Sequence, residues 1–66
     1  MLVIVNGQAR DIPAGTTVRA LIDLMGLAKQ ACAAEVNKAL VPRREHDART
    51  LAEGDHVELV SLVGGG

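Results

Sequence analysis

The sequence has no phenylalanine, tyrosine or tryptophan, and only one of its 66 residues is a cysteine. A single cysteine forms no disulfide within the chain, and Cys32 is too far from His46 and His56 in sequence to match a zinc-ligand pattern. A domain of this size has only a marginally sufficient core, so it depends on the apolar residues that make up 48% of the sequence. Because aromatic residues are absent, we expect an aliphatic core.

Long apolar runs and an excess of charge are also missing. No apolar run approaches the roughly 18 residues of a membrane span, and "MLVIVNG" at the N-terminus shows no basic leader or cleavage site. We therefore expect a cytoplasmic protein with no membrane partner. The net charge of −1 and the lack of aromatic side chains that stack on bases argue against a nucleic acid partner. Protein partners remain open.

The sequence has few residues of the types that commonly act in catalysis or bind a ligand. Neither G-x-G-x-x-G nor G-x-x-x-x-G-K is present, so no phosphate-binding loop is predicted. Cys32 stands among alanines, which is typical of a small buried apolar side chain, although the nearby Lys29 would favour a reactive thiolate. His46 and His56 have polar neighbours and no paired nucleophile, which predicts solvated turn residues. The pattern indicates no catalytic site.

Local patterns predict one helix and up to five strands. Asn6-Gly7 favours a type I′ hairpin turn between the first two strands. Thr16 or Thr17 is a candidate cap for a helix over residues 18–25, which Gly26 would end. The predicted strands cover residues 1–5, 8–12, 33–37, 39–43 and 56–63, and residues 43–56 are polar and turn-rich. One helix covers only one face of such a sheet, so the sequence predicts an α+β fold with one face open.

The first and last strands are apolar at nearly every position. Alternate side chains of a strand point to opposite faces of the sheet. The residues predicted to face the helix are Val3, Val5, Val57 and Leu59. The residues predicted to face away are Leu2, Ile4, Val60 and Leu62. The pattern leaves the register open, but an outward aliphatic patch indicates a surface that binds a protein, unless a dimer or the tail covers it.

Three glycines, Gly64, Gly65 and Gly66, end the sequence after a predicted domain over residues 1–63. Glycine has no side chain, so a flexible tail over residues 64–66 would thread a narrow channel and place its carboxylate roughly 10 Å beyond the last strand. A carboxylate becomes reactive only when its oxygen is made a good leaving group, for example by adenylation. Because no nucleotide site is predicted here, another enzyme would have to activate it.

The stretches "AAEVNKALVPRREH", "LAEGDHVELV" and "VGGG" together resemble the ThiS/MoaD ubiquitin-like family, and most closely the ThiS sulfur carriers of thiamine biosynthesis. The likeness covers essentially the whole chain. It implies a β-grasp (ubiquitin-like) fold, with a mixed sheet of four to five strands and one main helix packed on one face.

The resemblance also implies a protein substrate that binds no cofactor of its own. A ThiF-type adenylating enzyme would use Mg-ATP to adenylate Gly66, and sulfur from a cysteine desulfurase persulfide would replace AMP to leave a thiocarboxylate. Thiazole synthase would then accept the sulfur. Gly65 and Gly64 would thread the partner's active site. The residues assigned to docking are Leu62, Val63, Val60, Leu2 and Ile4.

Other functions are compatible with the sequence, among them a related carrier that serves cysteine or another sulfur pathway. A MoaD-like subunit of molybdopterin synthase has the same fold and tail chemistry, although such proteins are usually longer and commonly contain aromatic residues. A β-grasp binding module with inert glycines would tolerate deletion of Gly66. An enzyme acting through Cys32 would lose activity in Cys32→Ser but not on removal of Gly66. A further alternative treats "PRRE" over residues 42–45 as a docking patch for an acidic partner rather than a solvated turn.

Overall fold

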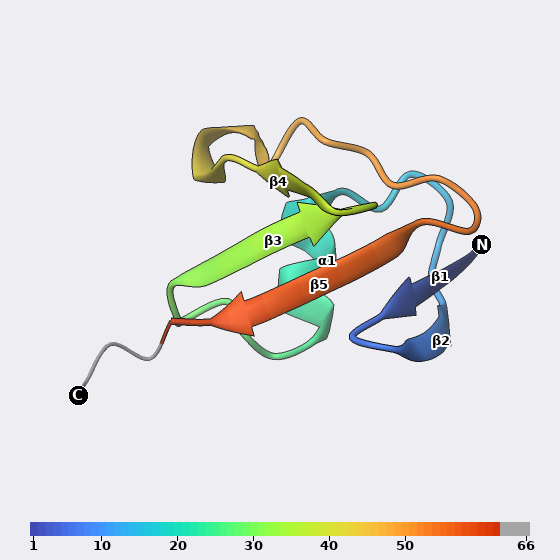
Figure 1. Ribbon diagram of the computed structural model, residues 1–66, viewed down its shortest axis with the longest axis horizontal. Coiled ribbons are helices and arrows are strands. Elements are labelled where there is room, and N and C mark those ends of the chain that lie inside the picture. The colour runs from blue at the N-terminus through green and yellow to red at the C-terminus, as the bar shows by residue number, and fades with distance from the viewer. Residues whose placement is uncertain (63–66) are drawn as a thin grey trace.

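The computed structural model describes residues 1–62, which form one five-stranded sheet with a helix across one face (Figure 1). The elements are β1 (Leu2–Val5), β2 (Gln8–Asp11), α1 (Val18–Leu24), β3 (Cys32–Val36), β4 (Ala39–Val41), the 3₁₀ turn η1 (Arg43–Glu45) and β5 (His56–Ser61). The strand order is β2-β1-β5-β3-β4. β1 and β5 are parallel and the other neighbours are antiparallel, so the sheet is mixed. The predicted α+β fold is confirmed.

Two asparagine turns join the hairpins. Asn6 and Gly7 have φ values of 49° and 82°, as a type I′ turn requires, so the predicted hairpin is confirmed. Asn37 and Lys38, with φ values of 52° and 70°, make the corresponding turn between β3 and β4. β4 stops immediately before Pro42 at the edge of the sheet, where the missing proline N–H breaks no ladder.

Helix α1 begins at the predicted residue, Val18, directly after a predicted cap. The Thr17 side chain caps it by accepting a hydrogen bond from the Ala20 N–H, with a distance of 3.1 Å between oxygen and nitrogen. The helix ends at Leu24, one residue earlier than predicted, because Met25 is the C-cap. Gly26 follows with a φ of 76°, which glycine adopts without steric cost.

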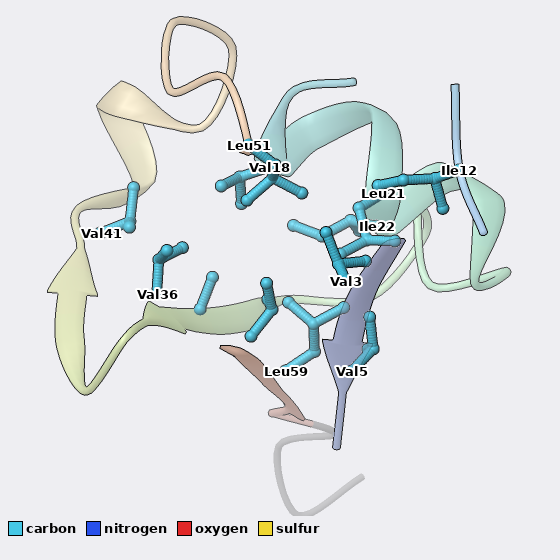
Figure 2. Close-up of a cluster of buried hydrophobic side chains, with 12 residues drawn as sticks. Val3, Val5, Ile12, Val18, Leu21, Ile22, Val36, Val41, Leu51 and Leu59 are labelled. Carbon is cyan, nitrogen blue, oxygen red and sulfur yellow. The ribbon is translucent and has the colours of Figure 1, made fainter. Parts of the chain in front are cut away.

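The core lies between α1 and the sheet and is entirely aliphatic (Figure 2). Its twelve buried residues are Val3, Val5, Ile12, Val18, Leu21, Ile22, Ala34, Val36, Val41, Leu51, Val57 and Leu59. The four strand residues predicted to face the helix are among them, so the predicted alternation of β1 and β5 is confirmed. Leu21 is the largest of the fully buried side chains.

The segment after β4 is more ordered than its polar sequence predicts. His46 is only 6% exposed, and its Nε2 lies 3.1 Å from the Val41 carbonyl oxygen, to which it donates a hydrogen bond. The prediction of a solvated His46 is therefore wrong, because η1 turns the chain back and the Val41 carbonyl satisfies the buried ring. His56 is exposed as predicted, but it is the first residue of β5 rather than a turn residue.

Candidate functional site

β5 is the strand that leads to the C-terminal glycines, and it occupies the centre of the sheet. It pairs with β1 only over the register Ile4 to His56 and Val5 to Val57, whereas it pairs with β3 from Cys32 to Val36. β1 therefore pairs with only the first two of the six residues of β5. Other groups must hold the rest of β5 on that side.

Asn6 supplies that support. Its side-chain Oδ1 accepts a hydrogen bond from the Leu59 N–H at 2.8 Å, and its Nδ2 donates to the Leu59 carbonyl at 3.2 Å. The side-chain amide thus takes the place of the backbone residue that β1 would have offered if it had continued. The sequence predicts Asn6 only as a turn residue, although asparagine at a turn is known to bond nearby backbone groups.

A second asparagine fixes the start of β5. Asn37 accepts a hydrogen bond from the His56 N–H at 3.0 Å and donates to Asp55 Oδ1 at 3.0 Å. The other carboxylate oxygen of Asp55, which is 9% exposed, accepts a hydrogen bond from the Ala52 N–H at 2.8 Å. This side-chain network was not predicted, because it connects two turns that are distant in the sequence.

The end of β5 is held by the loop that precedes β3. The Leu62 N–H donates to the Ala31 carbonyl oxygen at 2.6 Å, and the Ser61 hydroxyl bonds the Gln30 side chain. β5 is therefore fixed along its whole length up to Leu62. The predicted domain end at Val63 and the tail residues Gly64, Gly65 and Gly66 lie outside the described residues.

The sheet face opposite α1, here called the open face, is turned toward the viewer in Figure 1. Three residues predicted to face away from the helix are exposed: Leu2 by 44%, Val60 by 55% and Leu62 by 54%. Ile4 lies on the same face and is half-buried. These directions confirm the predicted alternation. Docking at Leu62, Val63, Val60, Leu2 and Ile4 stays a prediction.

The aliphatic residues of the open face form two groups rather than the one contiguous patch that was predicted. Ile4 lies opposite His56 in the parallel register, so Val60 stands four residues further along β5, about 13 Å away at 3.3 Å per residue. Leu40 on β4, which the prediction did not include, is 67% exposed and also belongs to this face. Glu58 lies between the two groups along β5, whereas His56 lies beside Ile4.

Cys32 does not have the environment of a nucleophile. Its side chain is half-buried against the core. Burial raises the pKa of the Cys32 thiol, and a backbone hydrogen bond at Val60 opposes that effect only in part. The expectation that Lys29 favours the thiolate is therefore not met, since a raised pKa lowers the thiolate fraction near neutral pH.

We expect the pH midpoint of Cys32 alkylation to lie higher in the folded protein than in the urea-unfolded chain. Desolvation favours the neutral thiol, so the thiolate forms only at higher pH. Iodoacetamide rates followed by intact mass across a pH series measure both midpoints, with Cys32→Ser as the unlabelled control. A folded midpoint equal to or below the unfolded one would contradict this account. Comparing midpoints rather than rates separates pKa from steric access.

The region between α1 and η1 is too small for a substrate site. A hollow of about 60 Å³ between α1 and η1 is lined in part by Arg19, Arg43 and His46, well below the roughly 300–1,000 Å³ of small-molecule sites. No three His, Cys, Asp or Glu side chains within residues 1–62 are arranged to hold a metal ion. No helix in that range is long and apolar enough to cross a bilayer.

Comparison with known proteins gives a consistent result. The model of the ThiS family matches residues 3–66. The chain is 39% identical over all of its 66 residues to a thiazole synthase of Magnetococcus marinus, of which it covers 20%. It is 29% identical to the sulfur carrier protein ThiS of Escherichia coli, with 100% of both chains covered. The crystal structure of the thiamine biosynthesis protein ThiS from Geobacter metallireducens matches with a TM-score of 0.83 at 29% identity, again over 100% of both chains.

These matches differ in how much of each relative they cover. The chain spans 20% of the length of the thiazole synthases it matches, but the whole length of the two proteins named ThiS. The family match covers the fold and continues through the glycines at residues 64–66. The chain therefore belongs to the ThiS family of sulfur carrier proteins.

Proposed function

We propose that the protein carries sulfur for thiazole formation in thiamine biosynthesis, as a thiocarboxylate on Gly66. The observation that carries the proposal is the family match, which runs to residue 66 and so includes the three glycines. The relatives named ThiS in E. coli and G. metallireducens, one described as a sulfur carrier and the other as a thiamine biosynthesis protein, support the same assignment. We place this chemistry in the cytoplasm.

The proposed chemistry has an activation step and a sulfur-transfer step. A carboxylate oxygen of Gly66 attacks the α-phosphorus of Mg-ATP on a ThiF-like adenylating enzyme, and pyrophosphate leaves. The terminal sulfur of a persulfide, formed by a cysteine desulfurase or another donor, then attacks the acyl carbon, and AMP leaves. A thiol cleaves the resulting S–S bond to release the thiocarboxylate, and its own sulfur forms a new disulfide with the donor.

The chain contributes positioning rather than catalysis in this scheme. Asn6, Asn37 and Ala31 accept hydrogen bonds from backbone N–H groups of β5 and of Leu62, so the strand presents the tail from a rigid base. Gly64 and Gly65 lack side chains, which suits a narrow channel that excludes water from the reacting carboxylate. We assign docking to Leu62, Val63 and Val60 at one end of the open face and to Leu2 and Ile4 at the other.

We propose thiazole synthase as the protein that takes up the sulfur. Two thiazole synthases, from M. marinus and Paramagnetospirillum magneticum, contain a region similar to this whole chain within one longer polypeptide. Two regions that must bind each other are joined in one polypeptide by such an arrangement, which gives each a high effective concentration near the other. It favours this acceptor over molybdopterin synthase, whose MoaD-like subunits remain the alternative with the same tail chemistry.

Intact mass spectrometry tests the proposal. The untagged protein is incubated with Mg-ATP, a ThiF-like adenylating enzyme and a sulfur source, and its mass is expected to rise by the difference between sulfur and oxygen at Gly66. Addition of thiazole synthase and its substrates should reverse the gain. No gain, with the adenylating enzyme shown active on another carrier, would indicate a binding module with inert glycines. A gain reversed only by molybdopterin synthase would indicate the MoaD-like function.

Leu62→Asp is expected to weaken binding of the adenylating enzyme by about 10- to 100-fold, because burying a leucine side chain contributes about 1.5–3 kcal/mol. Leu62 is 54% exposed, so its substitution should leave the thermal transition nearly unchanged. Leu24→Asp is the matched control, since Leu24 is 62% exposed on α1, on the other side of the sheet. Calorimetric titration measures both affinities. Equal affinities for the two variants would show that Leu62 is not a docking residue.

A further inference from the structure

Two glutamates face each other in the middle of the open face. Glu35 on β3 lies directly opposite Glu58 on β5 in the antiparallel register. Both alternate with buried residues, so both point away from α1, and both are exposed. Directly opposed strand residues have Cβ atoms about 4.5–5.5 Å apart, and like charges at this spacing destabilise a sheet.

Nothing among the described residues compensates this repulsion by a direct ion pair. The two ion pairs of residues 1–62 join the N-terminus to Asp11 and Arg19 to Asp23, and neither involves Glu35 or Glu58. Lys38 and His56 are the nearby groups that carry or can acquire positive charge, and they line a hollow of about 360 Å³ together with Asn37 and Glu58. The two carboxylates therefore lie on the open face with no ion-pair partner among the described residues. Beside them is a hollow large enough for one long side chain.

Apolar side chains flank the pair. In the register of the sheet, Leu40 lies opposite Glu35 on β4, and Val60 lies two residues beyond Glu58 on the same face of β5. Leu40 is 67% exposed and Val60 is 55% exposed. A partner that covers Leu40 and Val60 would also remove water from the two carboxylates, and buried carboxylates need a positively charged partner.

We propose that Glu35 and Glu58 determine the specificity of the open face by binding one arginine of the adenylating enzyme, whose guanidinium lies between the two carboxylates. The proposal rests on the carrier function proposed above and identifies the surface chemistry that its partner must have. A guanidinium is planar and presents five N–H donors, so its two edges can bond two carboxylates at once, whereas an ammonium offers a more compact charge. Apolar residues around that arginine would contact Leu40 and Val60.

A second copy of this chain fits the open face poorly. Two open faces packed against each other would bring two Glu35 and Glu58 pairs into one desolvated interface without a matching cation at its centre. Lys38 and His56 line the hollow together with Glu58 but not with Glu35. Charge complementarity thus favours a basic partner, and the pair also rejects surfaces without a cation.

The test uses the full chain with a purified ThiF-like adenylating enzyme and Mg-ATP. The double variant E35Q/E58Q keeps the side-chain shapes and removes both charges. E45Q/D47N is the control, because it removes the same charge from two exposed residues of the segment after β4, outside the strands of the sheet. We expect E35Q/E58Q to raise KM for the carrier at least 10-fold at low salt and to flatten the dependence of KM on salt. We expect its kcat at saturation and its thermal midpoint to be no lower than those of wild type. The control should behave as wild type.

Several outcomes would overturn the proposal while leaving the carrier function intact. One is a wild-type KM and salt dependence in E35Q/E58Q, and another is an equal rise of KM in E45Q/D47N. A third is a wild-type dimer in sedimentation equilibrium that dissociates in Val60→Asp, which would assign the face to a second copy. Absence of turnover with the wild-type chain, by an enzyme active on another carrier, would instead contradict the carrier function itself.

Discussion

Deletion of Gly66 is expected to abolish the ATP-dependent sulfur gain, with at least a 100-fold lower rate of conversion. β5 is anchored up to Leu62 by the Ala31 carbonyl, so the tail has a fixed starting point and cannot slide forward to compensate. Removing one residue withdraws the carboxylate by up to about 3.3–3.6 Å, and a misplacement of about 1 Å can reduce a rate about 100-fold. Single-turnover conversion followed by intact mass measures the loss.

Two further variants test separately the position of the terminal carboxylate and the identity of the reacting group. Addition of one residue after Gly66 should block conversion as strongly as the deletion, because it moves the carboxylate forward and puts a peptide bond in its former place. Cys32→Ser should convert at the wild-type rate, since Cys32 has a raised pKa and no part in the proposed scheme. Full conversion of the extended chain, or loss of conversion only in Cys32→Ser, would contradict a sulfur carrier that acts through Gly66.

The strands, the helix and the direction of most side chains are predictable from local sequence. Asn6-Gly7 determines a turn through backbone conformations that few other residue pairs adopt, and alternation along β1 and β5 separates core from surface. Thr17 and Gly26 mark the ends of α1 for equally local reasons. These features depend on residues a few positions apart, which is the range at which sequence patterns are informative.

The features that were missed depend on contacts between distant segments. The open face has two aliphatic groups because β1 pairs with the start of β5, and that parallel register joins residues more than fifty positions apart. The burial of His46 depends on the path of the chain after β4, and its hydrogen bond to the Val41 carbonyl is not visible as a motif. The bonds from Asn6 to Leu59 likewise appear only once β5 lies beside the first turn.

The candidate site likewise depends in part on local sequence and in part on contacts between distant segments. The chemical proposal for Gly66 comes from the sequence and the family match, and it does not depend on the sheet register. The opposition of Glu35 and Glu58 comes only from the register of β3 and β5. Each glutamate alone is an ordinary exposed strand residue, so only the pairing indicates what kind of partner surface the open face would bind.

Leu21→Ala is expected to destabilise the fold by about 2–5 kcal/mol. Leu21 is 0% exposed and is the largest fully buried side chain, so its truncation leaves a cavity in the layer between α1 and the sheet. At about 0.05–0.15 kcal/mol per residue, a chain of 66 residues has a total stability of about 3–10 kcal/mol. The substitution therefore removes a large fraction of the total, because the fold has no disulfide to compensate a weakened core.

Urea denaturation followed by far-ultraviolet circular dichroism measures this loss, since the chain has no tryptophan or tyrosine for fluorescence. Leu24→Ala is the matched control: it is the same substitution on the same helix at a side chain that is 62% exposed, and its effect should stay within about 0.5 kcal/mol. Equal losses of unfolding free energy in the two variants would contradict a core shared by β1, β5 and α1. A specific loss in Leu21→Ala would also establish that the rigid base of the tail depends on α1, since the same core holds β5 in place.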